Sequence, residues 1–294
     1  MPQNLATVYL KLLGMAFFWG GTFIAGRVIA RDVGPFAAAF LRFLIASAFL
    51  LVLLLKQERK LPPVKRSQVL PLILLGITGV FAYNVFFFKG LKLIEAGRAA
   101  IIIANNPILI ALCSAVLFKE QVTPKKALGV LLSVGGAVLA ISRGNPITLL
   151  QGGLGWGELF IGACVLSWVT FSLIGKTVMS GLSPLTSVTY SSAIGTAALF
   201  MPACYDGLLQ GLTQYGWTAW TGVFYLGFFG TVLGFVWYYE GIRAIGPTRA
   251  GLFINFVPIS AIILAFIILK EPLTVSLLGG AVLVSTGVYL TNTG

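Results

Sequence analysis

Long apolar runs separated by short polar segments recur along the whole chain. An α-helix needs about 20 apolar residues to cross the hydrocarbon of a bilayer, and ten runs near that length follow one another. They are Val8–Ala30, Phe36–Leu55, Val69–Leu91, Ala99–Phe118, Lys125–Ser142, Gly155–Val178, Leu185–Cys204, Trp217–Ile242, Pro247–Leu269 and Leu273–Thr291. Because barrel strands alternate and are shorter, these continuous runs predict an all-α integral membrane protein with ten transmembrane helices.

The composition excludes a water-soluble fold. Hydrophobic residues make up 58% of the chain and charged residues 10%, and the mean hydropathy is +0.97. A soluble domain has about 45–50% apolar and about 25% charged residues. No small-residue cleavage site follows the first run, so we expect that run to be retained as a helix and not removed as a signal peptide.

The net charge of +12 does not indicate nucleic acid, because the basic residues lie mainly in short loops. The densest cluster, in the loop Lys56–Gln68, predicts a cytoplasmic loop by the positive-inside rule. Both termini then face the cytoplasm of a bacterial inner membrane. Lys89, Lys92 and Arg98 on the opposite side make the bias imperfect.

The chain lacks the chemistry of an enzyme or a metal site. Histidine is absent, and the three cysteines lie inside apolar runs without metal or disulfide spacing, so we expect no metal and no cofactor. No paired carboxylates stand in the middle of a run, and a channel would need a ring of charge or repeated carbonyl loops. A carrier is therefore the first interpretation, with a channel or a membrane enzyme as remote alternatives.

The chain also repeats itself at an offset of 149 to 151 residues. We predict a first five-helix repeat over residues 1–145, a linker over 146–154 and a second repeat over 155–294. The matched positions include Trp19 with Trp168, Gly79 with Gly230, Pro107 with Pro258, and Lys119 and Glu120 with Lys270 and Glu271. Since five crossings is an odd number, the second repeat is inverted in the membrane.

Inverted repeats are typical of secondary transporters, whose substrate site lies near the bilayer midplane between the halves. We therefore expect alternating access to such a site, a small-molecule substrate, and the monomer as the functional unit.

Several short motifs resemble those of a known group. They are Trp19-Gly20-Gly21, Arg42, Ala96-Gly97-Arg98-Ala99, Asn106-Pro107, Phe118-Lys119-Glu120 and Leu269-Lys270-Glu271. With them the chain resembles the drug/metabolite transporter superfamily and, within it, the EamA-type ten-helix carriers. It also looks like the YddG-type exporters, which implies efflux of aromatic and other neutral amino acids. A multidrug carrier, or one for another metabolite, is the alternative within the same fold.

Pro107 and Pro258 interrupt the fourth and ninth runs, since each lacks the N–H that would bind the carbonyl four residues earlier. Paired interruptions at equivalent places point towards the substrate site. Three amides lie within one turn of these prolines: Asn105, Asn106 and Asn255. We predict that they bind the polar end of the substrate. Interhelical hydrogen bonds, worth about 0.6 kcal/mol on average, are the alternative role.

Aromatic residues inside the runs are the next candidates. Trp19, Tyr83, Trp168 and Tyr238 are predicted to wall the substrate pocket, together with Asn84, although packing and interfacial belts are the commoner uses of such residues. The glycines Gly79 and Gly230 are predicted bending points for gating.

The remaining charged and small residues are interpreted structurally. Lys89 and Glu240 lie near helix ends and are expected to reach water, and Arg42 and Glu158 also sit close to predicted ends. The Lys270-Glu271 turn is expected to be an exposed charge pair. Four glycines are expected to pack the halves together: Gly129, Gly136, Gly280 and Gly287.

Overall fold

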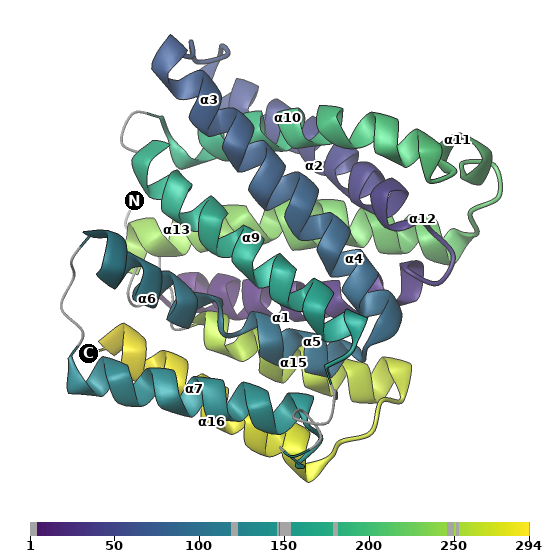
Figure 1. Cartoon of the computed structure of the whole chain (residues 1–294). Helices are drawn as coiled ribbons and strands as arrows, with labels where there is room; N and C mark the ends of the chain where they lie inside the picture. Colours follow the sequence, from purple (N-terminus) through teal and green to yellow (C-terminus); the bar gives the residue numbers. More distant parts are fainter. Residues whose placement is uncertain are drawn as a thin grey trace.

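The computed structural model of the chain describes residues 5–118, 123–145, 147, 154–178, 182–245, 250 and 253–293. Over these ranges it is all-helical and contains no strand (Figure 1). Six helices are long and apolar enough to cross a membrane: Leu5–Ile29, Pro35–Glu58, Arg66–Leu93, Pro124–Ile141, Trp156–Gly175 and Trp217–Ile242. Shorter apolar helices cover Ala96–Ile110, Phe253–Leu269 and Val275–Thr291.

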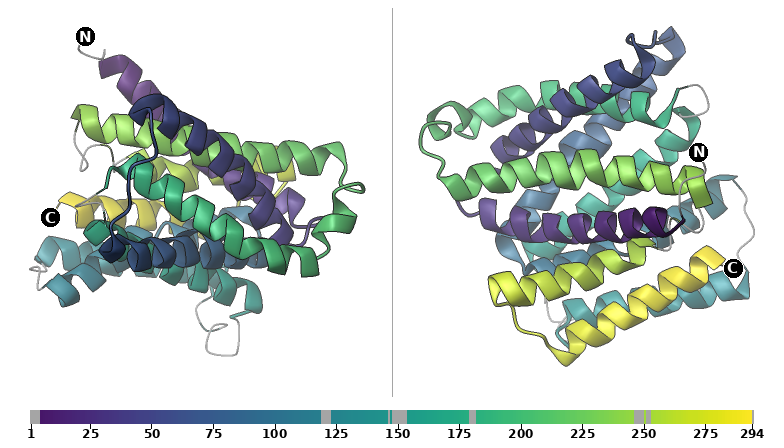
Figure 2. Two further views of the ribbon diagram at one scale, coloured as in Figure 1. Left: turned by 90° about the horizontal axis from the view of Figure 1, so that it is seen from above. Right: turned by 180° about the vertical axis from the view of Figure 1, so that it is seen from behind.

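Helix occurs within each of the predicted apolar runs. The first half of the sequence forms α1 (Leu5–Ile29), α2 (Pro35–Glu58), α3 (Arg66–Leu75), η1 (Gly76–Ala82), α4 (Tyr83–Leu93), α5 (Ala96–Ile103), α6 (Asn106–Phe118) and α7 (Pro124–Ile141). The second half forms α9 (Trp156–Val178), α10 (Pro184–Tyr205), α11 (Leu208–Gly211), α12 (Trp217–Phe224), η2 (Tyr225–Leu233), α13 (Gly234–Ile245), η3 (Phe253–Asn255), α15 (Phe256–Leu264), η4 (Ala265–Leu269) and α16 (Val275–Thr293). The start of α1 and the end of α16 lie at the same end of the bundle (Figures 1 and 2).

The fourth run is not one continuous helix. Ala104 and Asn105 form a turn between α5 and α6, and Pro107 is the second residue of α6. In the ninth run, Pro258 is the third residue of α15, which follows the 3-10 turn η3. A proline fits the first turn of a helix because the N–H that it lacks has no partner there in any case. Each proline therefore begins a new helical segment.

The third and eighth runs are unbroken, but each changes to π-helix in its middle. η1 joins α3 to α4, and η2 joins α12 to α13. π-Helical turns are rare and occur frequently at functional sites. The ring of Phe171 lies directly against the Cα of Gly79, and a methyl group at Gly230 would meet Thr22 Cγ2 at 2.5 Å. Because neither glycine has a side chain, a neighbouring helix packs directly against each π segment.

Helices α7 and α16 pack side by side at one edge of the bundle (Figures 1 and 2). A methyl group added at Gly129 would lie 2.6 Å from the Gly287 carbonyl oxygen, and one at Gly136 would lie 2.7 Å from that of Gly280. The four glycines expected to pack these two runs together therefore do so, because they let the two backbones approach closely.

Equivalent contacts recur in the two halves of the sequence. A methyl group at Gly76 would lie 2.9 Å from the Ser191 carbonyl oxygen, and one at Gly227 would lie 2.8 Å from that of Arg42. The first pair maps onto the second when each residue is exchanged for its partner 149 or 151 positions away. At the level of helices, α1 packs on α13 and α15, while α9 packs on α4 and α5.

Candidate functional site

A buried polar cluster joins three elements in the interior of the bundle. Arg42 of α2 is 7% exposed, and its Nη1 donates to Asn84 Oδ1 of α4 at 2.8 Å. Its Nε and Nη2 both donate to Thr231 Oγ1 of η2 at 3.3 Å. Asn84 and Thr231 are also buried, so water does not compete for these bonds.

The π segments hold the two neutral partners in place. Asn84 Nδ2 donates to the carbonyl oxygens of Gly79 and Val80 at 3.3 and 2.9 Å, and both of these residues lie in η1. Thr231 Oγ1 donates to the Leu226 carbonyl oxygen at 2.9 Å, within η2. Because each side chain is fixed by its own helix, Asn84 Oδ1 and Thr231 Oγ1 remain available as acceptors for Arg42.

Arg42 is buried although it lies in the first third of α2. It is the eighth residue of α2, about 11 Å along the axis from Pro35 at 1.5 Å per residue. Asn84 is nine residues, about 14 Å, from the end of α4 at Leu93. The end of α4 lies beside the start of α2, since Lys89 Nζ is 5.3 Å from the Phe36 ring centroid. Arg42 therefore lies near the start of α2, as expected from the sequence, but it is 7% exposed and its guanidinium does not reach water.

Aromatic side chains border the same cluster. Tyr83 precedes Asn84, and its ring lies 5.2 Å from that of Trp168 on α9. Cys164, four residues before Trp168 in α9, is fully buried. Tyr83 and Trp168 are only partly buried. Three predicted residues are thus connected to Arg42: Asn84 binds it directly, Tyr83 precedes Asn84, and Trp168 contacts Tyr83.

Trp19 and Tyr238 form an adjoining group on α1 and α13. The Trp19 indole N–H donates to the Gly230 carbonyl oxygen at 3.0 Å, and its ring lies 5.6 Å from that of Tyr238. Gly230 is next to Thr231 in η2, so this group is one residue away from a hydrogen-bond partner of Arg42.

The three amides near the prolines lie at the helix interruptions and are not hydrogen-bond partners of Arg42. Asn105 Nδ2 donates to the Ile101 carbonyl oxygen at 3.0 Å, and Asn105 Oδ1 accepts from Ser133 Oγ of α7 at 2.7 Å. These are the bonds of a helix cap and an interhelical contact. Asn106 is buried, and its Oδ1 has no hydrogen-bond partner among the residues that the structure describes. Asn255 is partly buried at the end of η3.

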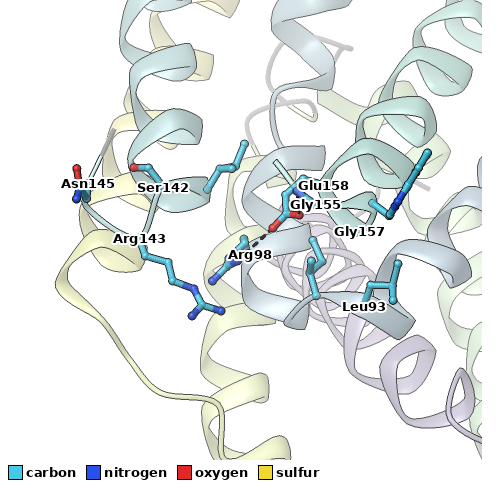
Figure 3. A pocket seen from close by; sticks show the side chains of 11 residues that line it. Leu93, Arg98, Ser142, Arg143, Asn145, Gly155, Gly157 and Glu158 are labelled. Atoms are coloured by element: carbon cyan, nitrogen blue, oxygen red, sulfur yellow. Dashed lines mark hydrogen bonds and ion pairs between the residues drawn. The ribbon is translucent and has the colours of Figure 1, made fainter. Parts of the chain in front are cut away.

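An open pocket of about 710 Å³ lies between the ends of α4 and α7 and the start of α9 (Figure 3), which are at the end of the bundle away from the termini (Figure 1). It is lined by Leu93, Ile94, Arg98, Ile141, Ser142, Arg143, Asn145, Gly155, Trp156, Gly157 and Glu158. Arg98 Nη1 is 3.2 Å from Glu158 Oε1, and Arg98 Nη2 is 3.2 Å from Glu95 Oε2. None of the predicted site residues lines this pocket. Its charged side chains Arg98, Arg143 and Glu158 are paired with one another or with Glu95.

Further carboxylates fasten helix ends to one another. Glu271 accepts from the N–H groups of Ala96 and Gly97 at 2.9 and 3.1 Å and lies 3.8 Å from Arg27 Nε. The expectation of an exposed charge pair is wrong for Glu271, which caps α5 from a distant part of the chain. Asp206 caps α2 in the same way by accepting from the N–H of Phe36 at 2.8 Å. Lys119 and Glu120 lie outside the described residues.

Glu240 and Lys89 both have partners near helix ends. Glu240 pairs with Lys11 at 2.6 Å, and Lys89 lies over the rings of Phe36 and Phe160. Over the part of the chain that the structure describes, no group of three His, Cys, Asp or Glu side chains is placed to hold a metal ion.

Comparisons with known proteins agree with this arrangement. The sequence pattern of the EamA-like transporter family matches residues 6–142 and 155–293. The uncharacterized transporter YyaM of Bacillus subtilis is 31% identical, over 96% of this chain and 92% of its own length. An uncharacterized transporter of Archaeoglobus fulgidus is 28% identical, over 93% and 94% of the two chains. A solved crystal structure, 21% identical and covering 98% of both chains, superposes with a TM-score of 0.63 and shows likeness of fold.

Proposed function

This chain belongs to the EamA-like transporter family, and from that premise we propose that it is a secondary carrier that exports neutral and aromatic amino acids. Membership makes it a multi-pass membrane transporter with a small-molecule substrate. The substrate, the direction of transport and the monomeric unit belong to the proposal.

The proposed architecture is ten transmembrane helices in two inverted repeats, residues 1–145 and 155–294. The recurring contacts of the two halves support it. Ser47 and Thr196, which are 149 positions apart, also face each other across α2 and α10 with their hydroxyl oxygens 3.1 Å apart. Residues related by the offset meet in this way when they lie beside a two-fold axis. Such an axis in the membrane plane is the basis of alternating access in inverted repeats.

The observation that carries the proposal is the cluster around Arg42, which both halves build. The first half contributes Tyr83 and Asn84, and the second contributes Trp168 and Thr231. In this proposal the substrate places its side chain against Tyr83 and Trp168, with Trp19 and Tyr238 as further walls, and its polar end against the buried hydrogen-bonding groups.

The helix interruptions supply additional polar groups under the same proposal. Asn106, whose buried Oδ1 lacks a partner, is the amide best supported as a substrate contact. Asn105 and Asn255 stay predicted substrate contacts. The side-chain amide of Asn105 is already hydrogen bonded to α5 and α7. Pro107 and Pro258 are proposed to keep both interruptions in place.

We place the protein in the bacterial cytoplasmic membrane with both termini in the cytoplasm. The basic loop between α2 and α3 lies at the same end of the bundle as the described termini (Figure 1), which the positive-inside rule favours for the cytoplasm. The pocket at Arg98 then faces outward. In the proposed cycle the ion pairs of Arg98 break as the outer end opens, and the π segments bend at Gly79 and Gly230.

Uptake into liposomes tests the proposal. Purified protein is reconstituted, and the uptake of labelled L-phenylalanine and other neutral amino acids is measured against empty liposomes, with and without a pH gradient. The Trp168→Ala variant should lose most of the uptake. Trp217→Ala, which removes an indole that is 83% exposed, serves as the matched control and should retain it. Folded wild-type protein that takes up no amino acid would refute the proposed substrate and redirect the search to other metabolites or cationic drugs.

A further inference from the structure

We propose that Arg42 binds the carboxylate of the transported molecule, so that the substrates are carboxylic acids or zwitterions and not organic cations. The inference rests on the proposed carrier function and names the substrate class of the same site. It follows from the state of charge of the cluster, from the repeat, and from the shape of the guanidinium.

Arg42 is a buried cation without a counter-ion among the described residues. Seven of the eight Asp and Glu residues are described, and none lies within 4 Å of its nitrogen atoms. Its hydrogen-bond acceptors are the neutral oxygens of Asn84 and Thr231, and Phe43 places its ring centroid 5.3 Å from the guanidinium carbon. A charge inside a membrane protein is costly, and where it persists it pairs with another charge or marks a ligand pathway.

Arg98 provides an internal comparison. It is also 7% exposed, yet it is within 3.2 Å of two carboxylates, Glu95 and Glu158. Two arginines of equal burial thus differ in charge compensation. Carboxylates of the protein neutralise the charge of Arg98. The charge of Arg42 has no such partner among the described residues, so the carboxylate of a bound substrate can neutralise it.

Packing does not explain the guanidinium. The position that corresponds to Arg42 in the second half is Ser191, which is buried and makes the same backbone contact with a glycine of a π segment. The fold therefore forms this contact with a short side chain. Only one of the two equivalent positions carries a charge. This difference is expected if the charge binds a ligand, and it is not expected if the side chain serves packing alone.

The chemistry of the cluster fits a carboxylate. A guanidinium has five N–H donors in a planar fork that matches a carboxylate with two parallel bonds, and three of them are used here by two neutral atoms. Tyr83 directly precedes Asn84, the hydrogen-bond partner of Arg42, and its ring contacts that of Trp168, so both rings are available to an apolar group. An aromatic acid would thus place its carboxylate on Arg42 and its ring against these side chains.

Four probes that share a phenyl ring distinguish recognition of a carboxylate from recognition of an amine. L-Phenylalanine and 3-phenylpropionate carry a carboxylate, while L-phenylalaninamide and phenethylamine carry only the amine. Their binding to purified full-length wild-type protein is measured by the shift in thermal unfolding, and their competition is measured by counterflow in liposomes. Both acids should bind at least about tenfold more tightly than the amide and the amine, which corresponds to about 1.4 kcal/mol or more.

Two variants test the assignment to Arg42. Arg42→Gln should weaken both acids at least about tenfold and leave the two amines unchanged, and Arg42→Lys, which keeps a charge without the fork, should fall between. Equal binding of acids and amines by the wild type, or unchanged acid binding by a folded Arg42→Gln, would overturn the inference. If Arg42→Gln does not fold, Arg42→Lys decides, because acid binding equal to that of the wild type would overturn the assignment to Arg42.

The outcomes also separate this inference from the amino acid proposal. Transport of phenylalanine with equal competition by the amide would keep the carrier proposal and remove the role of Arg42. Binding of 3-phenylpropionate that depends on Arg42, without transport of amino acids, would keep the role of Arg42 and refute the amino acid proposal. Binding of the amines alone, or of none of the four probes, would overturn the carboxylate assignment.

Discussion

The contact between α7 and α16 gives a prediction with a built-in control. Gly135 and Gly136 are neighbours in α7 but face different surroundings. A methyl group at Gly136 would lie 2.7 Å from the Gly280 carbonyl oxygen and 2.8 Å from Leu283 Cβ, whereas one at Gly135 would meet nothing within 4 Å. We predict that Gly136→Ala destabilises the protein and that Gly135→Ala does not.

The magnitude follows from the difference between the two variants. Both replace a helical glycine by alanine, so the gain in helix propensity, about 0.5–1 kcal/mol, is common to them and cancels. What remains is the cost of forcing backbone atoms apart, about 1–3 kcal/mol for an overpacked methyl group. Gly136→Ala should therefore be about 1–3 kcal/mol less stable than Gly135→Ala.

Unfolding of the two variants in the same bicelles, followed by thermal midpoint and by steric trapping, measures this difference. The wild type is the common reference, and counterflow activity confirms the native fold. Equal stability of the two variants would refute the reasoning, since it would mean that α16 moves away from α7 at no cost.

Three further predictions follow from single contacts. Thr231→Val should lower stability by about 1–2 kcal/mol because it removes the acceptor of two guanidinium N–H groups, while Thr221→Val, whose exposed hydroxyl bonds only to its own helix, should be neutral in the same unfolding assay. Asp206→Ala should cost about 1 kcal/mol through the lost cap of α2, detectable as a lower thermal midpoint. Gly79→Ala should abolish transport by blocking the close approach of α9, whereas Gly162→Ala, with nothing within 4 Å, should retain it; equal uptake would exclude Gly79 from gating.

The helices could be predicted from the sequence because apolar runs of membrane-spanning length permit hardly any other structure. The glycine faces of α7 and α16 could also be predicted, since a small residue recurring on one face has few uses besides close packing. Tyr83, Asn84 and Trp168 were found as candidates because polar and large aromatic side chains stand out in an apolar run.

The partners of these residues could not be found in the same way. Thr231 looks unremarkable in its run because threonine satisfies its hydroxyl on its own helix, and only the fold shows that its oxygen also faces Arg42. The position of Arg42 along its helix likewise says nothing about which neighbours surround it. The caps by Asp206 and Glu271 join residues about 170 positions apart, and local sequence carries no signal of such contacts.

Comparison of the two halves separates the residues of the fold from those of the site. Positions that match under the offset, such as Gly79 with Gly230 and Gly136 with Gly287, form close contacts between helices. The members of the cluster mostly do not match: the residues that correspond to Arg42, Tyr83, Asn84 and Thr231 are Ser191, Gly234, Phe235 and Val80. Under the proposed inverted repeat, the shared residues can move symmetrically, whereas recognition of an asymmetric molecule requires residues that differ between the halves. Substitutions at the unmatched positions should therefore change substrate preference, while substitutions at the matched glycines should change stability and rate for all substrates alike.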